Sequence, residues 1–180
     1  MNKKKFYWET RELVVIGTFA ALIKIVSFLV AITGGGMNPI SMVAKNVVST
    51  ALLIILVFNV RKFGVLSLYV VISGMISILT MGRGLMLLPG VLIAGFACDV
   101  IIKMCGGYKS SFAVLAGVAL FDIFYRAISL ALGYLFMREN PQLLYFACIT
   151  VAIGYVGCLI GLFTGNIFAK ELKHAGIIKE

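Results

Sequence analysis

Three cationic side chains and one carboxylate stand inside long apolar segments of this sequence. They are Lys24, Lys45, Arg126 and Asp122. One carboxylate cannot neutralise three cations, so the excess positive charge in a low-dielectric layer requires water, an uncharged lysine or an anionic ligand. Ionisable residues at such depth indicate a functional site by default. The chemistry predicted is binding of an anionic or strongly hydrogen-bonding small molecule.

Lys45 belongs to a polar stripe on the segment that begins after a run of three glycines, residues 34–36. At four-residue spacing, one helical row holds Ser41, Lys45 and Ser49, and the next holds Met42, Asn46 and Thr50. Asn38 joins the glycine run, which we expect to act as a flexible loop or lid, to this stripe. We predict that this helix forms one wall of a pocket, through Asn38, Ser41, Met42, Lys45 and Asn46.

The other walls are expected from the first and fifth apolar segments. Lys24 lies about 12 residues into the first and Arg126 about 14 into the fifth, which at about 1.5 Å per residue places them at similar depth. The predicted site therefore also includes Lys24, Arg83 at a loop rim, Asp122, Tyr125 and Arg126. The alternative is that Asp122 and Arg126 form a structural pair while Lys24 and Lys45 extend toward the headgroups.

The elements that must position these residues are membrane-spanning helices. Of the 180 residues, 62% are hydrophobic and only 13% charged, whereas roughly a quarter of an ordinary soluble domain is charged. The apolar runs are continuous, which excludes the alternating pattern of a β-barrel. We predict an all-α integral membrane protein, a single domain over residues 1–180 with six transmembrane helices. The predicted spans are about 13–32, 40–60, 65–80, 85–104, 112–136 and 145–168.

The net charge of +9 is distributed unevenly between the two sets of loops and ends. Nearly all the lysines and arginines outside the spans fall in one set, whereas the opposite set holds only Arg83 and Arg138. This is the positive-inside pattern, which predicts that both termini are cytoplasmic and does not indicate nucleic-acid binding. The expected location is the cell membrane, as a multi-pass protein.

Catalytic signals are mostly absent from the sequence. The only histidine, His174, lies in the C-terminal tail, and the four cysteines form no C-x-x-C pair. There is no phosphate-binding Walker motif and no pair of carboxylates at depth. We therefore expect no enzyme activity in this chain, no cofactor and no metal site.

Small residues define two helix faces. Gly157, Gly161 and Gly165 form a doubled G-x-x-x-G row, which we expect to pack against another helix of the same chain. Gly17, Ala20 and Ala21 leave one face of the first span nearly smooth, where a partner helix could dock. Near the end of the fourth span, Asp99 and Lys103 stand one turn apart and are expected to pair.

The layout of the chain resembles the substrate-binding S component of an energy-coupling factor (ECF) vitamin transporter. The resemblance rests on six short-looped spans in 180 residues, a basic leader, the first-span sequence from Thr10 to Ile23 and the long first outer loop. Such S components carry an alanine-x-x-x-alanine docking pattern, and this chain has Gly17-x-x-x-Ala21 at that position. The resemblance implies a vitamin or related micronutrient bound in the outer half of the membrane and released inward. It also implies a membrane coupling (T) subunit and two cytoplasmic ATPase subunits as partners.

Two other classes of membrane protein remain open. A small structural scaffold protein of the cell-shape type would need no pocket, so Lys45 and Asn46 would be dispensable. A small solo secondary transporter would require acidic residues at the midplane, for which Asp122 is the sole candidate. The identity of the substrate is not determined by the sequence.

Overall fold

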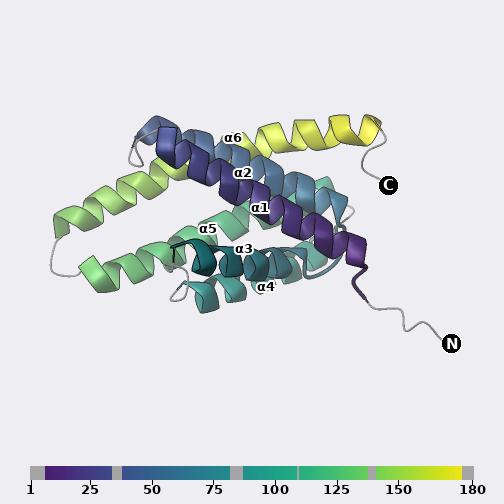
Figure 1. Cartoon of the computed structure of the whole chain (residues 1–180), viewed down its shortest axis with the longest axis horizontal. Helices are drawn as coiled ribbons and strands as arrows, with labels where there is room; N and C mark the ends of the chain where they lie inside the picture. The colour runs from purple at the N-terminus through teal and green to yellow at the C-terminus, as the bar shows by residue number, and fades with distance from the viewer. Residues whose placement is uncertain (1–6, 34–37, 82–86, 109, 138–140, 176–180) are drawn as a thin grey trace.

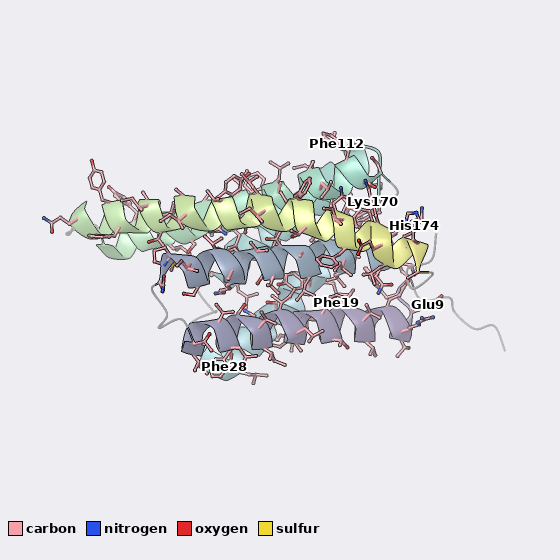
Figure 2. The ribbon with its side chains drawn as sticks, turned by 90° about the horizontal axis from the view of Figure 1, so that it is seen from above. Glu9, Phe19, Phe28, Phe112, Lys170 and His174 are labelled. Carbon is pink, nitrogen blue, oxygen red and sulfur yellow. The ribbon has the colours of Figure 1, made fainter. Side chains whose placement is uncertain are left out.

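The computed structural model of this chain describes residues 7–33, 38–81, 87–108, 110–137 and 141–175. All regular structure in these ranges is helical: α1 (Thr10–Thr33), α2 (Pro39–Asn59), α3 (Val65–Met81), α4 (Leu88–Met104), α5 (Ser111–Met137) and α6 (Pro141–His174). The helices run back and forth along one long axis, so that the start of α1 and the end of α6 lie at the same end (Figure 1). We call this the terminal end, marked by Glu9 and His174 in Figure 2, and the opposite one the distal end.

The helices differ in whether their length and hydropathy suffice to cross a membrane. Among the described residues, four segments are long and apolar enough: Thr10–Val30, Pro39–Asn59, Ser111–Tyr134 and Tyr145–His174. Helices α3 and α4 have 17 residues each, about 25 Å of helix against a hydrocarbon core of about 30 Å. The all-helical fold with six helices is confirmed, whereas six crossings and two cytoplasmic termini stay predictions.

The starts of α1, α4 and α6 and the end of α6 each differ by three residues or more from the predicted spans, because hydropathy reports the apolar stretch and not the limits of the helix. Helix α6 begins at Pro141, a residue suited to a first turn, and continues past residue 168 through Lys170, Glu171 and Lys173, which are good helix formers. Helix α4 begins at Leu88, with Pro89 in its first turn. A proline in the first turn removes no intrahelical hydrogen bond, so Pro89 is compatible with a regular helix at this position.

The closest packing in the molecule joins α2 to α6 along the predicted glycine row. A methyl group added at Gly157 would lie 2.7 Å from the carbonyl oxygen of Val43, and one at Gly161 would lie 2.7 Å from that of Val47. Gly165 faces Ala51 in the same way. The row therefore brings two backbones together within the chain, as predicted, and holds the polar helix α2 in place.

The terminal end contains a buried carboxylate whose hydrogen bonds all come from neutral groups. Asp99 on α4 is 0% exposed and accepts from the backbone nitrogens of Leu66 (3.3 Å) and Ser67 (2.9 Å) at the start of α3. It also accepts from the Ser67 hydroxyl (2.6 Å) and the Tyr108 hydroxyl (2.6 Å). Asp99 thus caps the N-terminus of a neighbouring helix, where a negative charge is favourable. Burial and the nearby carboxylate raise the pKa of Tyr108, which keeps its hydroxyl a donor.

The expected pairing of Asp99 with Lys103 is wrong. Asp99 points inward to α3, whereas Lys103 is exposed and places its Nζ 5.4 Å from the centre of the Phe63 ring. The physical reason is that the two unoccupied N–H groups at the start of α3 satisfy a buried carboxylate better than one flexible, hydrated ammonium group. The terminal ion pair among the described residues is instead Lys62 with Glu12, at 2.7 Å.

Candidate functional site

A cavity of about 270 Å³ lies among α1, α2, α3, α4 and α5, away from the Asp99 network. Its polar lining comes from four of these helices: Lys24 and Ser27 on α1; Lys45, Asn46, Ser49 and Thr50 on α2; Tyr69, Ser73 and Ser77 on α3; Asp122 and Tyr125 on α5. Apolar residues such as Leu53, Val70, Val91, Val118 and Phe121 line the rest. Ligand pockets typically combine such an apolar wall with a few convergent polar groups.

The α1 and α3 walls meet through a lysine–serine contact. The Lys24 ammonium group donates to Ser77 Oγ at 2.5 Å, and the Ser77 hydroxyl donates its own proton to the carbonyl oxygen of Ser73 at 2.9 Å. Ser77 is therefore oriented as an acceptor for Lys24. This contact fixes Lys24 at the cavity but gives it no negative partner.

The α2 wall carries groups that lack partners within the described part of the chain. Lys45 is exposed, lines the cavity and makes no hydrogen bond or ion pair with any described residue. The Oγ atom of Ser49, one turn further along, is buried without a hydrogen-bond partner among those same residues. Because buried polar atoms are rarely left unpaired, Ser49 is a group that a bound molecule could satisfy, and Lys45 offers such a molecule a cation one turn away.

The α5 wall contains the acidic residue of the site. Asp122 Oδ2 accepts from Arg126 Nε at 2.6 Å, and Arg126 Nη2 also donates to the carbonyl oxygen of Gly154 on α6 at 3.1 Å. Arg126 does not line the cavity, so its guanidinium group faces α6 while Asp122 reaches the cavity. The ion pair leaves Lys24 and Lys45 as the uncompensated charges of the lining.

Five of the ten predicted binding residues line this cavity: Lys24, Lys45, Asn46, Asp122 and Tyr125. The structure does not bring Asn38, Ser41, Met42 or Arg126 to it. Asn38 lies at the start of α2, where its side chain accepts from the backbone nitrogen of Ile40 at 3.1 Å as an N-cap. The Ser41 hydroxyl donates to the carbonyl oxygen of Asn38 at 2.8 Å. Arg83 and the glycine run 34–36 lie outside the described residues.

Sequence reasoning missed the α3 wall of the cavity. Tyr69, Ser73 and Ser77 recur at four-residue spacing, the same periodicity that indicated the stripe on α2. Ser27, three residues after Lys24, shares a face with it. Both signals are visible in the sequence, but serine and tyrosine are common enough in apolar helices that they did not distinguish these positions.

The three residues of the predicted docking face on α1 do not share one environment in the structure. Ala20 is 0% exposed and belongs to the interior of the chain. Gly17 has no atom within 4 Å of the position of an added methyl group, and Ala21 is half-buried. An open face is therefore present along Gly17 and Ala21, which share one helical row, and Ala20 lies about a quarter-turn away from it.

A family model described as "Hypothetical bacterial integral membrane protein (Trep_Strep)" matches residues 10–141. This segment contains helices α1 to α5 and every residue that lines the cavity, whereas almost all of α6 lies beyond it. No curated protein and no solved structure matches the chain.

Proposed function

The chain belongs to the Trep_Strep family of bacterial integral membrane proteins, and we propose that it is the substrate-binding S component of an ECF-type importer. In this role it binds a vitamin or related micronutrient and delivers it with a membrane coupling subunit and two ATPase subunits. The chain itself carries no ATPase chemistry in this proposal. The observation that supports it is the polar cavity within the helical bundle, which Lys24 and Lys45 line without an ion-pair partner among the described residues, an arrangement that favours an anionic ligand.

The lining indicates the class of substrate. Lys24 and Lys45 favour a carboxylate or phosphate, and the serine hydroxyls of α2 and α3 offer donors and acceptors for polar ring atoms. Tyr125 and Phe121 provide aromatic surface on α5. At about 270 Å³, the cavity is near the lower limit of ligand pockets, roughly 300 Å³. We therefore propose a compact, anionic molecule and not one of tetrapyrrole size.

The test is whether the protein carries and transports a small molecule. The chain is purified with a mild detergent from its native host, and both the co-purifying small molecules and the co-purifying proteins are identified by mass spectrometry. The proposal predicts one bound anionic compound and an ATPase pair with its coupling subunit. Absence of both in native preparations would exclude the S-component role and would favour a structural scaffold, which needs no ligand.

Lys45→Ala sharpens this test because the Lys45 side chain is exposed and makes no hydrogen bond or ion pair with the described residues, so its loss should leave the protein folded. We expect retention of the bound compound to fall about tenfold or more, since a charge-assisted hydrogen bond contributes about 1.5–3 kcal/mol. Lys103→Ala, which removes an exposed lysine at the terminal end, is the matched control and should retain the compound. Equal retention in both variants would remove Lys45 from the binding site.

A further inference from the structure

A second, smaller cavity of about 80 Å³ lies at the terminal end, among the ends of three helices. It is lined by Phe58 and Arg61 after α2, by Ser111 at the start of α5, and by Asn166, Ala169, Lys170 and Lys173 on the last turns of α6. Lys170 is labelled at this end in Figure 2. We call it the basic cavity. It shares no lining residue with the larger cavity, so it is independent of the proposed transport role.

The lining of the basic cavity contains three cations and no carboxylate. Arg61 is held in place because its Nε donates to the carbonyl oxygen of Phe58 at 3.1 Å, which leaves the two terminal nitrogens of the guanidinium group for another acceptor. Neither Arg61 nor Lys170 forms an ion pair with any residue that the structure describes. Arg61, Lys170 and Lys173 therefore line one hollow, and neither Arg61 nor Lys170 has a carboxylate partner among the described residues.

Two further features suit an anion at this position. Ser111 opens α5, a helix of 27 residues, so the lining includes a helix N-terminus with its unpaired N–H groups and positive dipole end. The Oδ1 atom of Asn166 is buried without a hydrogen-bond partner among the described residues. Since the oxygen and nitrogen of an asparagine amide are interchangeable by a flip, Asn166 can present its NH₂ group to an anion at the same place.

We propose that the basic cavity binds a phosphate group. Its volume accommodates only a few water molecules, at about 30 Å³ each, which suits one tetrahedral group and not a whole nucleotide. Arg61 would form the bidentate contact for which a guanidinium group is suited, and Lys170 and Lys173 would supply point charges. The phosphate would come from the headgroup of an anionic phospholipid at the membrane surface or from free phosphate in solution. Basic pockets between helices at a membrane surface are a known form of headgroup recognition.

The experiment uses the full-length protein in a neutral detergent, with binding followed by native mass spectrometry. One sample is titrated with short-chain phosphatidic acid and another with inorganic phosphate. We expect saturable binding of one molecule per chain, and Arg61→Gln and Lys170→Gln should each weaken it about tenfold. Binding of phosphatidic acid alone identifies a lipid headgroup as the source, whereas equal binding of inorganic phosphate identifies the free ion. Both results support the site.

Two controls separate a built site from diffuse surface charge. Lys103→Gln makes the same charge change at the same end but outside the basic cavity, and it should leave binding unchanged. Ala169→Leu keeps all three cations but places a larger side chain in the cavity, and it should abolish binding if the variant elutes and melts as a folded monomer. If Ala169→Leu does not fold, the test is the comparison of Lys170→Gln with Lys103→Gln, because both lysines are exposed. The proposal is overturned if neither probe saturates, or if Lys103→Gln weakens binding as much as Lys170→Gln.

Discussion

Two carboxylates inside this bundle have opposite surroundings. Asp99, near the terminal end, is fully buried and accepts four hydrogen bonds from neutral groups of α3 and of the turn after α4. Asp122, on α5, is bonded to one arginine and borders a cavity with two further cations. In the first region, which we call the closed region, Asp99 and its donors satisfy one another by hydrogen bonds. In the second, the open region, Lys45 and Ser49 have no hydrogen-bond partner among the described residues.

The difference shows how polar residues in an apolar bundle can be assigned to structure or to binding. A buried network whose members are all satisfied rigidifies the fold. A hollow with surplus donors is stable only with water or a ligand in it. Both regions are built around an aspartate inside an apolar bundle, so the count of satisfied donors and acceptors is the feature that distinguishes them.

The largest effect is expected from breaking the closed region. In Asp99→Leu, the two N–H groups at the start of α3 and the hydroxyls of Ser67 and Tyr108 lose their common acceptor inside the protein. We expect the free energy of unfolding to fall by about 3–5 kcal/mol, because several buried donors are left without an acceptor and each unsatisfied group costs about 1–3 kcal/mol. Thermal unfolding in detergent measures the change. The control in the open region is the double variant Asp122→Asn, Arg126→Gln, which removes the ion pair without leaving Arg126 unpaired, and an equal loss there would contradict the distinction.

A smaller loss is expected where α6 holds the polar helix α2. Gly161→Ala places a methyl group 2.7 Å from the carbonyl oxygen of Val47, so the two backbones must separate, at a cost of about 1–3 kcal/mol. Gly133→Ala is the matched control because an added methyl group at Gly133 has no atom within 4 Å. Thermal unfolding of both variants checks the prediction. Comparable melting temperatures would mean that the glycine row does not set the α2–α6 distance.

The sequence was sufficient to predict the fold class, the six helices and the internal packing of the Gly157–Gly161–Gly165 row. These follow from local quantities, namely hydropathy over a span and the spacing of small residues. Of the ten residues assigned to the predicted binding site, Lys24, Lys45, Asn46, Asp122 and Tyr125 line the cavity.

The remaining features depend on how the helices rotate about their axes, which no local pattern determines. Arg126 stands one residue after Tyr125, yet it faces α6 while Tyr125 lines the cavity. Asp99 binds the N-terminus of α3 and not Lys103 for the same reason, because the position of α3 beside α4 depends on tertiary packing. The α3 wall of Tyr69, Ser73 and Ser77 became recognisable only when Lys24 was found opposite it.

The position of Arg126 leads to a prediction about a residue that does not touch the cavity. In Arg126→Gln, Asp122 loses its partner, and its carboxylate can then offset one of the two positive charges of Lys24 and Lys45. We expect retention of the co-purifying anionic compound to fall about tenfold, equivalent to about 1.4 kcal/mol. The double variant Asp122→Asn, Arg126→Gln removes both charges and should restore retention, as measured by mass spectrometry. Failure of the double variant to recover would indicate that Arg126 acts on the fold and not on the charge of the cavity.

The smallest effect is expected for Ser49→Ala in the open region, and it is measured against Ser67→Ala in the closed one. Ser67→Ala removes a hydroxyl that donates to Asp99 at 2.6 Å and should lower the free energy of unfolding by about 1.5–3 kcal/mol, the contribution of a hydrogen bond to a charged group. Ser49→Ala removes a buried hydroxyl without a partner in the described part of the chain. It should leave the stability of the ligand-free protein unchanged or raise it by up to about 1 kcal/mol. Stabilisation of Ser49→Ala by the compound should be lower than that of the unmodified protein, and thermal unfolding with and without the compound measures both quantities. A Ser49→Ala variant that is as unstable as Ser67→Ala would show that the open region is held together by the same internal hydrogen bonding as the closed one.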